Sequence, residues 1–140
     1  MLIADTGFFY ALADRSDRWH ARACEALAAI HEPLITTWPV LAETTHLMNA
    51  RLAPNVATRF LHDVASGFSA VFHLETVLIE RCAKLMKKYQ SLPMDLADAS
   101  LVLLAEHLDH GRILTTDERD FGGYRFKNTA PFKNELLSPT

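Results

Sequence analysis

The sequence predicts an α/β fold, a three-layer α/β/α sandwich in which helices cover both faces of a central, mainly parallel sheet. Short apolar, strand-like runs alternate along the chain with helical patterns of ten or more residues, and parallel strands need such helix-length connections. The 140 residues are 49% hydrophobic and 22% charged, which suits one globular core. No internal repeat, low-complexity segment or long linker divides the sequence, so we expect one domain at residues 1–140.

The first part of the chain predicts two strands and three helices. In chain order these are a strand at 1–5, helices at 8–13 and 19–30, a strand at 34–37 and a helix at 39–53. Both strands are short apolar runs, which is typical of strands buried in a parallel sheet. Thr6 can cap the first helix. Pro33 ends the second helix, and Pro39 suits the first turn of the third.

The second part predicts three more helices and two or three strands. In chain order these are a helix at 56–67, a strand at 68–74, helices at 77–89 and 94–110, a strand at 112–116 and a short edge strand beginning at Phe126. Gly67 and Gly111 end helices, and three lysines close to the end of the 77–89 helix suit its C-terminus. Residues 117–124 predict a turn-rich loop, and residues 131–140 a weakly ordered or peripheral tail.

Four carboxylates stand where soluble proteins seldom place them. Asp5 and Asp117 each end a strand-like run, so in a parallel sheet both reach the carboxyl ends of the strands, where ligands bind. Glu43 and Asp98 each share the apolar stripe of a helix. An ionised carboxylate that faces a core is costly unless it is paired or holds a metal. The sequence therefore predicts one acidic pocket that holds a divalent cation.

The chemistry of these candidate ligands favours Mg²⁺ or Mn²⁺, which prefer hard oxygen donors. Histidine and cysteine pairs at zinc-binding spacing are absent from the sequence. A carboxylate cluster with bound Mg²⁺ is suited to phosphodiester hydrolysis, because the metal activates water and neutralises charge on the phosphate. Hydroxyl groups that can support the cluster belong to Thr6, Ser100 and Thr116.

Two further acids lie near the predicted ligands. Asp95 follows Pro93 and Met94 and is first of all a helix cap. It also precedes Asp98 by three residues, so an outer role at the metal stays open. We interpret Asp120 mainly as a turn residue. The alternative is the outer role at the metal that also stays open for Asp95.

Net charge, cysteine spacing and the length of apolar segments indicate which classes of protein the chain can belong to. A formal net charge of −3 does not indicate a nucleic-acid binder. It does not exclude one either, because the acids of a metal site lower the net charge even when other parts of the surface are positive. Cys24 and Cys82 have neither CxxC nor metal-site spacing, so we interpret them as reduced packing residues. Asp5 interrupts the N-terminal apolar run, so we expect no signal peptide. No apolar segment has transmembrane length, and we therefore expect a cytoplasmic protein without membrane contact.

These residues give the chain a resemblance to the PIN-domain family, in particular to the VapC-like ribonuclease toxins of bacterial toxin–antitoxin pairs. The matching pieces, in order, are Leu2–Thr6, Val40–Glu43, Asp98–Val102 and Leu114–Arg125. Each motif alone is weak, but four in this order are specific, and the last is the most specific.

The resemblance implies a PIN-like α/β/α fold and an endoribonuclease that depends on Mg²⁺ or Mn²⁺. It implies that Asp5, Glu43, Asp98 and Asp117 are both the catalytic residues and the metal ligands, with Thr116 as a polar neighbour. It also implies a homodimer that a small antitoxin protein neutralises.

An RNA substrate would have to approach this acidic pocket past its own negative charge, so arginines at the rim are candidate phosphate contacts. The candidates are Arg15, Arg18, Arg51, Arg112, Arg119 and Arg125. Arg119 and Arg125 rank first, because they lie in or near the loop that begins at Asp117.

Three alternative functions fit the sequence less well, and the first of them stays open. A non-catalytic PIN-fold module could bind RNA or protein, although an intact set of four acids argues against it. An aspartic protease is suggested by Asp5-Thr6-Gly7, but a helical pattern follows at once where a protease needs β-hairpins. A Rossmann-like nucleotide binder lacks its Gly-rich loop after the first strand.

Overall fold

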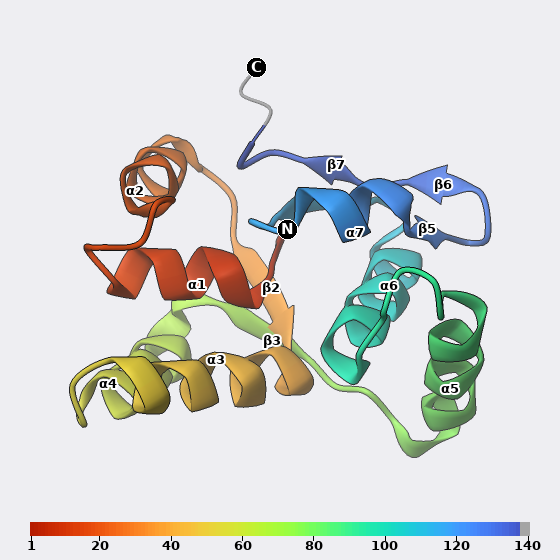
Figure 1. The fold of residues 1–140 in the computed structure, drawn as a ribbon, viewed down its shortest axis with the longest axis horizontal. Coiled ribbons are helices and arrows are strands. Elements are labelled where there is room, and N and C mark those ends of the chain that lie inside the picture. Colours follow the sequence, from red (N-terminus) through yellow and green to blue (C-terminus); the bar gives the residue numbers. More distant parts are fainter. Residues whose placement is uncertain (138–140) are drawn as a thin grey trace.

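The structure is a computed structural model that describes residues 1–137 of the chain (Figure 1). Within these residues a five-stranded sheet has the strand order β3-β2-β1-β4-β7, and each neighbouring pair runs parallel. The strands are β1 (Leu2–Ala4), β2 (Leu34–Thr37), β3 (Ala70–Phe72), β4 (Arg112–Leu114) and β7 (Lys133–Asn134). The parallel α/β fold expected from the sequence is therefore confirmed.

Helices flank this sheet, with α1 to α4 on one side of the view and α5 and α6 on the other (Figure 1). The helices are α1 (Thr6–Ala13), α2 (His20–Ala29), α3 (Trp38–Arg51), α4 (Val56–Asp63), α5 (Ile79–Lys88), α6 (Leu96–Leu108) and α7 (Glu118–Gly123). Two short turns, η1 (Val64–Phe68) and η2 (Thr76–Leu78), adjoin α4 and α5. α6 is apolar on most of its surface and buries eight side chains, which fixes the first turn of this helix against the sheet.

The start of α1 differs from the sequence expectation. Asp5, and not Thr6, caps the helix: the Thr6 amide donates to Asp5 Oδ1 at 2.7 Å. The reason is that β1 ends at Ala4, so Asp5 is the last extended residue, with φ −100° and ψ 166°. Thr6 is thereby drawn into the helix as its first residue.

The expected loop at 117–124 is a short helix, α7. Asp117 caps it by accepting a hydrogen bond from the Asp120 amide at 3.0 Å. Phe121 and Tyr124 are buried behind it, with their ring centroids 5.1 Å apart. Capping and this aromatic contact stabilise a helical turn that the two glycines at its end would otherwise disfavour.

The expected peripheral tail is in part a component of the sheet. Two backbone hydrogen bonds, Lys133 to Gly111 and Glu135 to Ile113, are both 2.8 Å long and dock β7 beside β4. Leu136 is 1% exposed. Ahead of β7, an antiparallel ribbon joins β5 (Arg125–Phe126) to β6 (Ala130–Pro131). The part of this prediction that concerns residues 138–140 lies outside the described residues.

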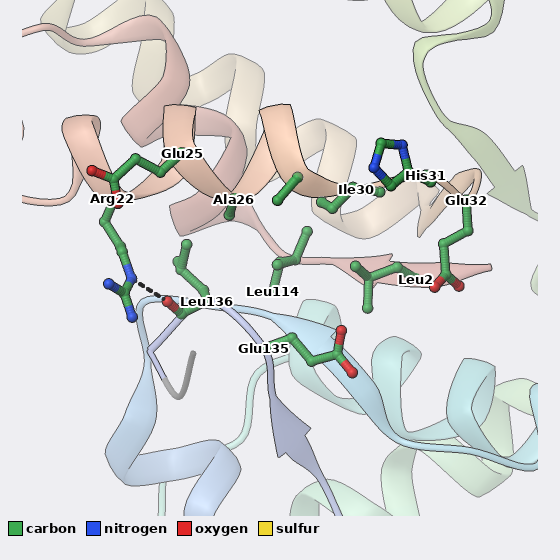
Figure 2. A pocket seen from close by; sticks show the side chains of 11 residues that line it. Leu2, Arg22, Glu25, Ala26, Ile30, His31, Glu32, Leu114, Glu135 and Leu136 are labelled. Carbon is green, nitrogen blue, oxygen red and sulfur yellow. Dashed lines mark hydrogen bonds between the residues drawn. The ribbon is translucent and has the colours of Figure 1, made fainter. Parts of the chain in front are cut away.

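A cavity of about 610 Å³ lies between α2 and the sheet (Figure 2). Ala23 is the buried residue of this helix. Figure 2 shows Ala26 of α2 and Ile30, the residue that follows this helix, on one side of the cavity, with Leu114 and Leu136 opposite. Among residues 1–137, no helix is long and apolar enough to cross a membrane.

Candidate functional site

A second, smaller cavity of about 360 Å³ lies where β1 and β4 end. Seven carboxylates line it, those of Asp5, Asp17, Glu43, Asp95, Asp98, Asp117 and Asp120. The four acids singled out from the sequence therefore share one cavity. Asp5 and Asp117 arrive from strand ends, while Glu43 of α3 and Asp98 of α6 enter from helices. Asp95 and Asp120, which were expected at its margin, line it too.

Asp5 is the most buried of these acids, with 6% of its surface exposed. Its Oδ1 accepts from the Thr6 amide at 2.7 Å, and its Oδ2 accepts from the Thr115 hydroxyl at 2.8 Å. Burial raises the pKa of Asp5 to about 7, and the nearby charges of Glu43 and Asp117 raise it as well, although both hydrogen bonds oppose the shift. Asp5 is therefore poised between its neutral and charged forms near neutral pH.

Asp98 occupies the third position of α6, where it forms a capping box with Asp95. The Asp98 amide donates to Asp95 Oδ1 at 2.8 Å, and the Asp95 amide donates to Asp98 Oδ2 at 3.3 Å. The buried Tyr124 hydroxyl can donate to Asp98 Oδ2, at 3.3 Å, and shares its proton with the carbonyl oxygens of Leu92 and Pro93, at 3.3 and 3.2 Å. Burial raises the pKa of Asp98 to about 8, and the charges of Asp95 and Asp5 add to the shift.

Glu43 and Asp117 complete the cluster, and both have a raised pKa. For Glu43 the main cause is burial, followed by repulsion from Asp95. For Asp117 it is again burial, reinforced by the neighbouring Asp120. The Thr6 hydroxyl lies near enough to Glu43 to oppose the shift, yet within residues 1–137 this buried oxygen has no partner in hydrogen-bond geometry. A buried hydroxyl without a partner, aimed at a carboxylate cluster, is a group that a ligand could satisfy.

The donor set fits a hard divalent cation. All candidate ligands are oxygens, and burial and mutual repulsion raise the pKa values of Asp5 and Asp98, so a bound cation would stabilise their ionised forms. In the conformation seen, no three histidine, cysteine or acidic side chains of the described residues converge closely enough to hold one ion. Coordination of one ion by three of these acids would therefore require rotamer changes.

The hydroxyl groups expected around the site are arranged differently from the prediction. Thr115, which the sequence reading passed over, donates to Asp5 and accepts from the Asp117 amide at 3.0 Å. Thr116 lines the cavity and packs on Gly7, where an added Cβ would overlap its hydroxyl. The missed signal is local turn chemistry: a threonine hydroxyl can accept from the amide two residues further on, as that of Thr115 does from Asp117.

Ser100, the third hydroxyl that was expected near the acids, does not line the cavity. It is fully buried, and its hydroxyl lies 2.6 Å from that of Thr37 and 2.6 Å from the Ala97 carbonyl oxygen. Ser100 therefore joins the start of α6 to the end of β2 and positions Asp98 only through the helix.

The two arginines ranked first as phosphate contacts lie outside the cavity lining. Arg119 is exposed on α7. Arg125 uses its guanidinium to donate to the carbonyl oxygens of Gly122 and Tyr124, at 3.0 and 2.8 Å. Of the six arginine candidates, the cavity lining includes Arg51, from the end of α3.

The larger cavity under α2 has a different electrostatic character. Its Glu32 accepts from both Arg112 Nη atoms, at 2.7 and 2.8 Å, and pairs with the N-terminal ammonium at 3.3 Å. These contacts lower the pKa of Glu32 to about 2. Glu135 lies 3.8 Å from Arg112. Because Glu32 and Glu135 are paired with neighbouring cations, the larger cavity is not an acidic site of the kind described above.

Comparison with known proteins gives the same picture of the fold. The family model of the PIN domain matches residues 2–127. Ribonuclease VapC26 of Mycobacterium tuberculosis is 29% identical over 124 residues, which cover 89% of this chain and 92% of that protein. VapC20 of Mycobacterium tuberculosis, described as a toxin that cleaves the sarcin–ricin loop, superposes with a TM-score of 0.81 at 21% identity. The superposition covers 94% of this chain and 100% of VapC20.

Proposed function

Because this chain belongs to the PIN-domain family, we propose that it is a metal-dependent endoribonuclease that cleaves RNA phosphodiester bonds, and that it is the toxin of a VapBC-type toxin–antitoxin pair. One observation carries the proposal. Acids from two strand ends and two helices line one cavity, and burial together with mutual repulsion raises their pKa values. Such an arrangement is unfavourable for a fold to maintain unless the acids bind a cation.

In this proposal Asp5, Glu43, Asp98 and Asp117 are the catalytic residues and hold Mg²⁺ or Mn²⁺. The bound ion would activate water and neutralise charge on the scissile phosphate. The fit rests on the all-oxygen donor set and on the unpartnered Thr6 hydroxyl.

The neighbouring side chains would keep these ligands in place. Thr115 holds one Asp5 oxygen and the Asp117 amide, so it fixes both strand ends relative to each other. Tyr124 holds one Asp98 oxygen. Asp95, Asp120, Thr6 and Thr116 are proposed to contact waters of the ion rather than the ion itself, as carboxylates and hydroxyls around a metal site commonly do.

We also propose the cellular setting that the family resemblance implies. Residues 1–140 act as one nuclease domain, in the cytoplasm, as a homodimer, and a small antitoxin protein neutralises them. The named relatives, a VapC ribonuclease and a VapC toxin, support this setting. Light scattering on purified protein measures the dimer, and co-purification with the product of an adjacent small gene tests for the antitoxin.

The alternative is a PIN-fold module that binds RNA or protein without cleaving it. A cleavage assay separates the two. End-labelled structured and unstructured RNAs are pooled and incubated with Mg²⁺, Mn²⁺ or EDTA, beside Asp98→Asn and the control Asp63→Asn, an exposed aspartate on α4. The nuclease predicts cuts that need the metal, survive in the control and vanish in Asp98→Asn. Cuts that persist in Asp98→Asn would refute the metal-site proposal, and no cuts from folded protein would favour the binding module.

A further inference from the structure

The candidate site has one end that the proposed acid chemistry does not use. Beyond Glu43, the cavity continues past Leu47 to Tyr10, Asp17 and Arg51. Glu43, Leu47 and Arg51 follow one another at intervals of four residues on α3, so they form one stripe along the cavity wall. The cavity lining thus follows α3 from Glu43, at the cluster of the four predicted acids, to Arg51, and Asp17 is the one further acid at the arginine end.

Arg51 is held in position without being neutralised. Its guanidinium carbon lies 5.6 Å from the centre of the Tyr10 ring, in cation–π geometry. The Tyr10 hydroxyl donates to Asp14 at 2.7 Å, which fixes the ring. Among residues 1–137, no carboxylate forms an ion pair with Arg51. A guanidinium that is oriented but forms no ion pair, in a cavity that seven carboxylates line, is available to an anionic ligand.

The distance along α3 matches a polyanion that extends from the acidic end. Eight residues separate Glu43 from Arg51, which is roughly 12 Å along the helix axis at 1.5 Å per residue. Stacked nucleotides rise about 3.4 Å per phosphate in one strand, so this span corresponds to about four phosphates or fewer. A single free phosphate or a mononucleotide would not reach both ends.

We infer that Arg51, oriented by Tyr10, contacts a phosphate of single-stranded RNA within about four nucleotides of the bond that is cut. This inference rests on the proposed function, because it takes the acidic end as the place of cleavage. Arg51 would set the direction in which the strand crosses the site, and it would contribute to substrate binding rather than to the chemical step. Arg119 and Arg125, outside the cavity lining, would not share this role.

The test uses an RNA oligonucleotide that the parent protein cleaves. Arg51→Met keeps an unbranched side chain and removes the charge, while Arg51→Lys keeps the charge. The matched control is Arg59→Met, an exposed arginine of α4 that does not line the cavity. We expect Arg51→Met to raise KM about tenfold with little change in kcat, Arg51→Lys to recover part of the loss, and the control to behave as the parent.

A second readout distinguishes a phosphate contact from a structural role. Neutral methylphosphonates replace the phosphates near the cut one at a time. In the parent, one of these replacements should raise KM about as much as Arg51→Met does. In Arg51→Met, the same replacement should not raise KM further. The slope of log K against log salt should also fall by about 0.7 in Arg51→Met, the value for one phosphate contact on a single strand. Unchanged KM and slope in Arg51→Met, or an unchanged methylphosphonate pattern, would overturn the inference.

Failure of the proposed function would give a different result. If the folded parent cuts no RNA, filter binding of single-stranded RNA replaces the kinetic readout. Weaker binding by Arg51→Met than by Arg59→Met would then uphold the contact in a non-catalytic module. Equal binding would overturn it, and would leave Arg51 as a structural partner of Tyr10 or a contact for another protein.

Discussion

Replacing Asp98 with asparagine should make the metal-free protein more stable at alkaline pH. Burial and the neighbouring acids raise the pKa of Asp98 from 3.8 to about 8. A carboxyl whose pKa is raised on folding contributes stability below its unfolded value, and the contribution is lost as pH rises through the folded value. The shift spans roughly four pH units. At about 1.36 kcal/mol per unit, the ionised Asp98 therefore lowers the free energy of unfolding above pH 8 by at most roughly 6 kcal/mol.

Between pH 5 and pH 8, the same relation limits the stability that the parent loses through Asp98 to roughly 4 kcal/mol. We expect about half of this to be measured, roughly 2 kcal/mol, because the exposed Asp95 can turn toward solvent and so weaken its repulsion of Asp98. Urea unfolding in EDTA, at both pH values, gives the difference in stability between Asp98→Asn and the parent. Asp63→Asn is the control. A difference that does not grow in favour of Asp98→Asn between pH 5 and pH 8 would refute the electrostatic reasoning.

Three further substitutions test the geometry of the site. Gly7→Ala should lower the free energy of unfolding by about 1–3 kcal/mol, because its methyl group overlaps Thr116, and adding Thr116→Ala should restore most of the loss in a thermal melt. Thr115→Val removes the hydroxyl that joins the two strand ends, so it should reduce kcat about tenfold to a hundredfold. Circular dichroism should show that the fold is kept. An unchanged kcat would show that this hydroxyl has no positioning role. Tyr124→Phe leaves Asp98 without one donor and should shift the acidic limb of the pH–rate profile to higher pH, while a shift to lower pH would contradict the assigned hydrogen bond.

The parts of the structure that depend on local pattern could be predicted from the sequence. The alternation of strands and helices gave the parallel sheet, since burial on both faces leaves a continuous apolar run. Asp5 and Asp117 could be placed because the carboxyl ends of parallel strands meet at one edge of a sheet. Glu43 and Asp98 could be placed because the spacing of apolar residues fixes which way a helical side chain points.

The missed elements depend on contacts between distant residues. β7 has two residues, both polar, and it joins the sheet through backbone hydrogen bonds rather than through an apolar pattern. α7 contains two glycines, and it is held by the Asp117 cap and by packing of Phe121. Neither element has a periodicity that a short window of sequence would show.

The same limit applies to the supporting residues of the site. Arg51 ranked behind Arg119 and Arg125 because only proximity in sequence to Asp117 was available to order them. Its place in the cavity results from α3 packing beside α1, where Tyr10 lies 41 positions away in the chain. Distance in sequence from Asp117 does not show which arginines line the cavity.

The most direct test of the central claim is calorimetric titration of the parent protein with Mn²⁺ at pH 7, in two buffers of different ionisation enthalpy. Metal binding must displace protons from Asp5 and Asp98, whose pKa values lie near 7 and 8. The account predicts binding with net proton release, and both loss of affinity and reduced release in Asp5→Asn and Asp98→Asn. Absence of binding by the folded parent, or equal affinity and proton release in parent and variants, would contradict it.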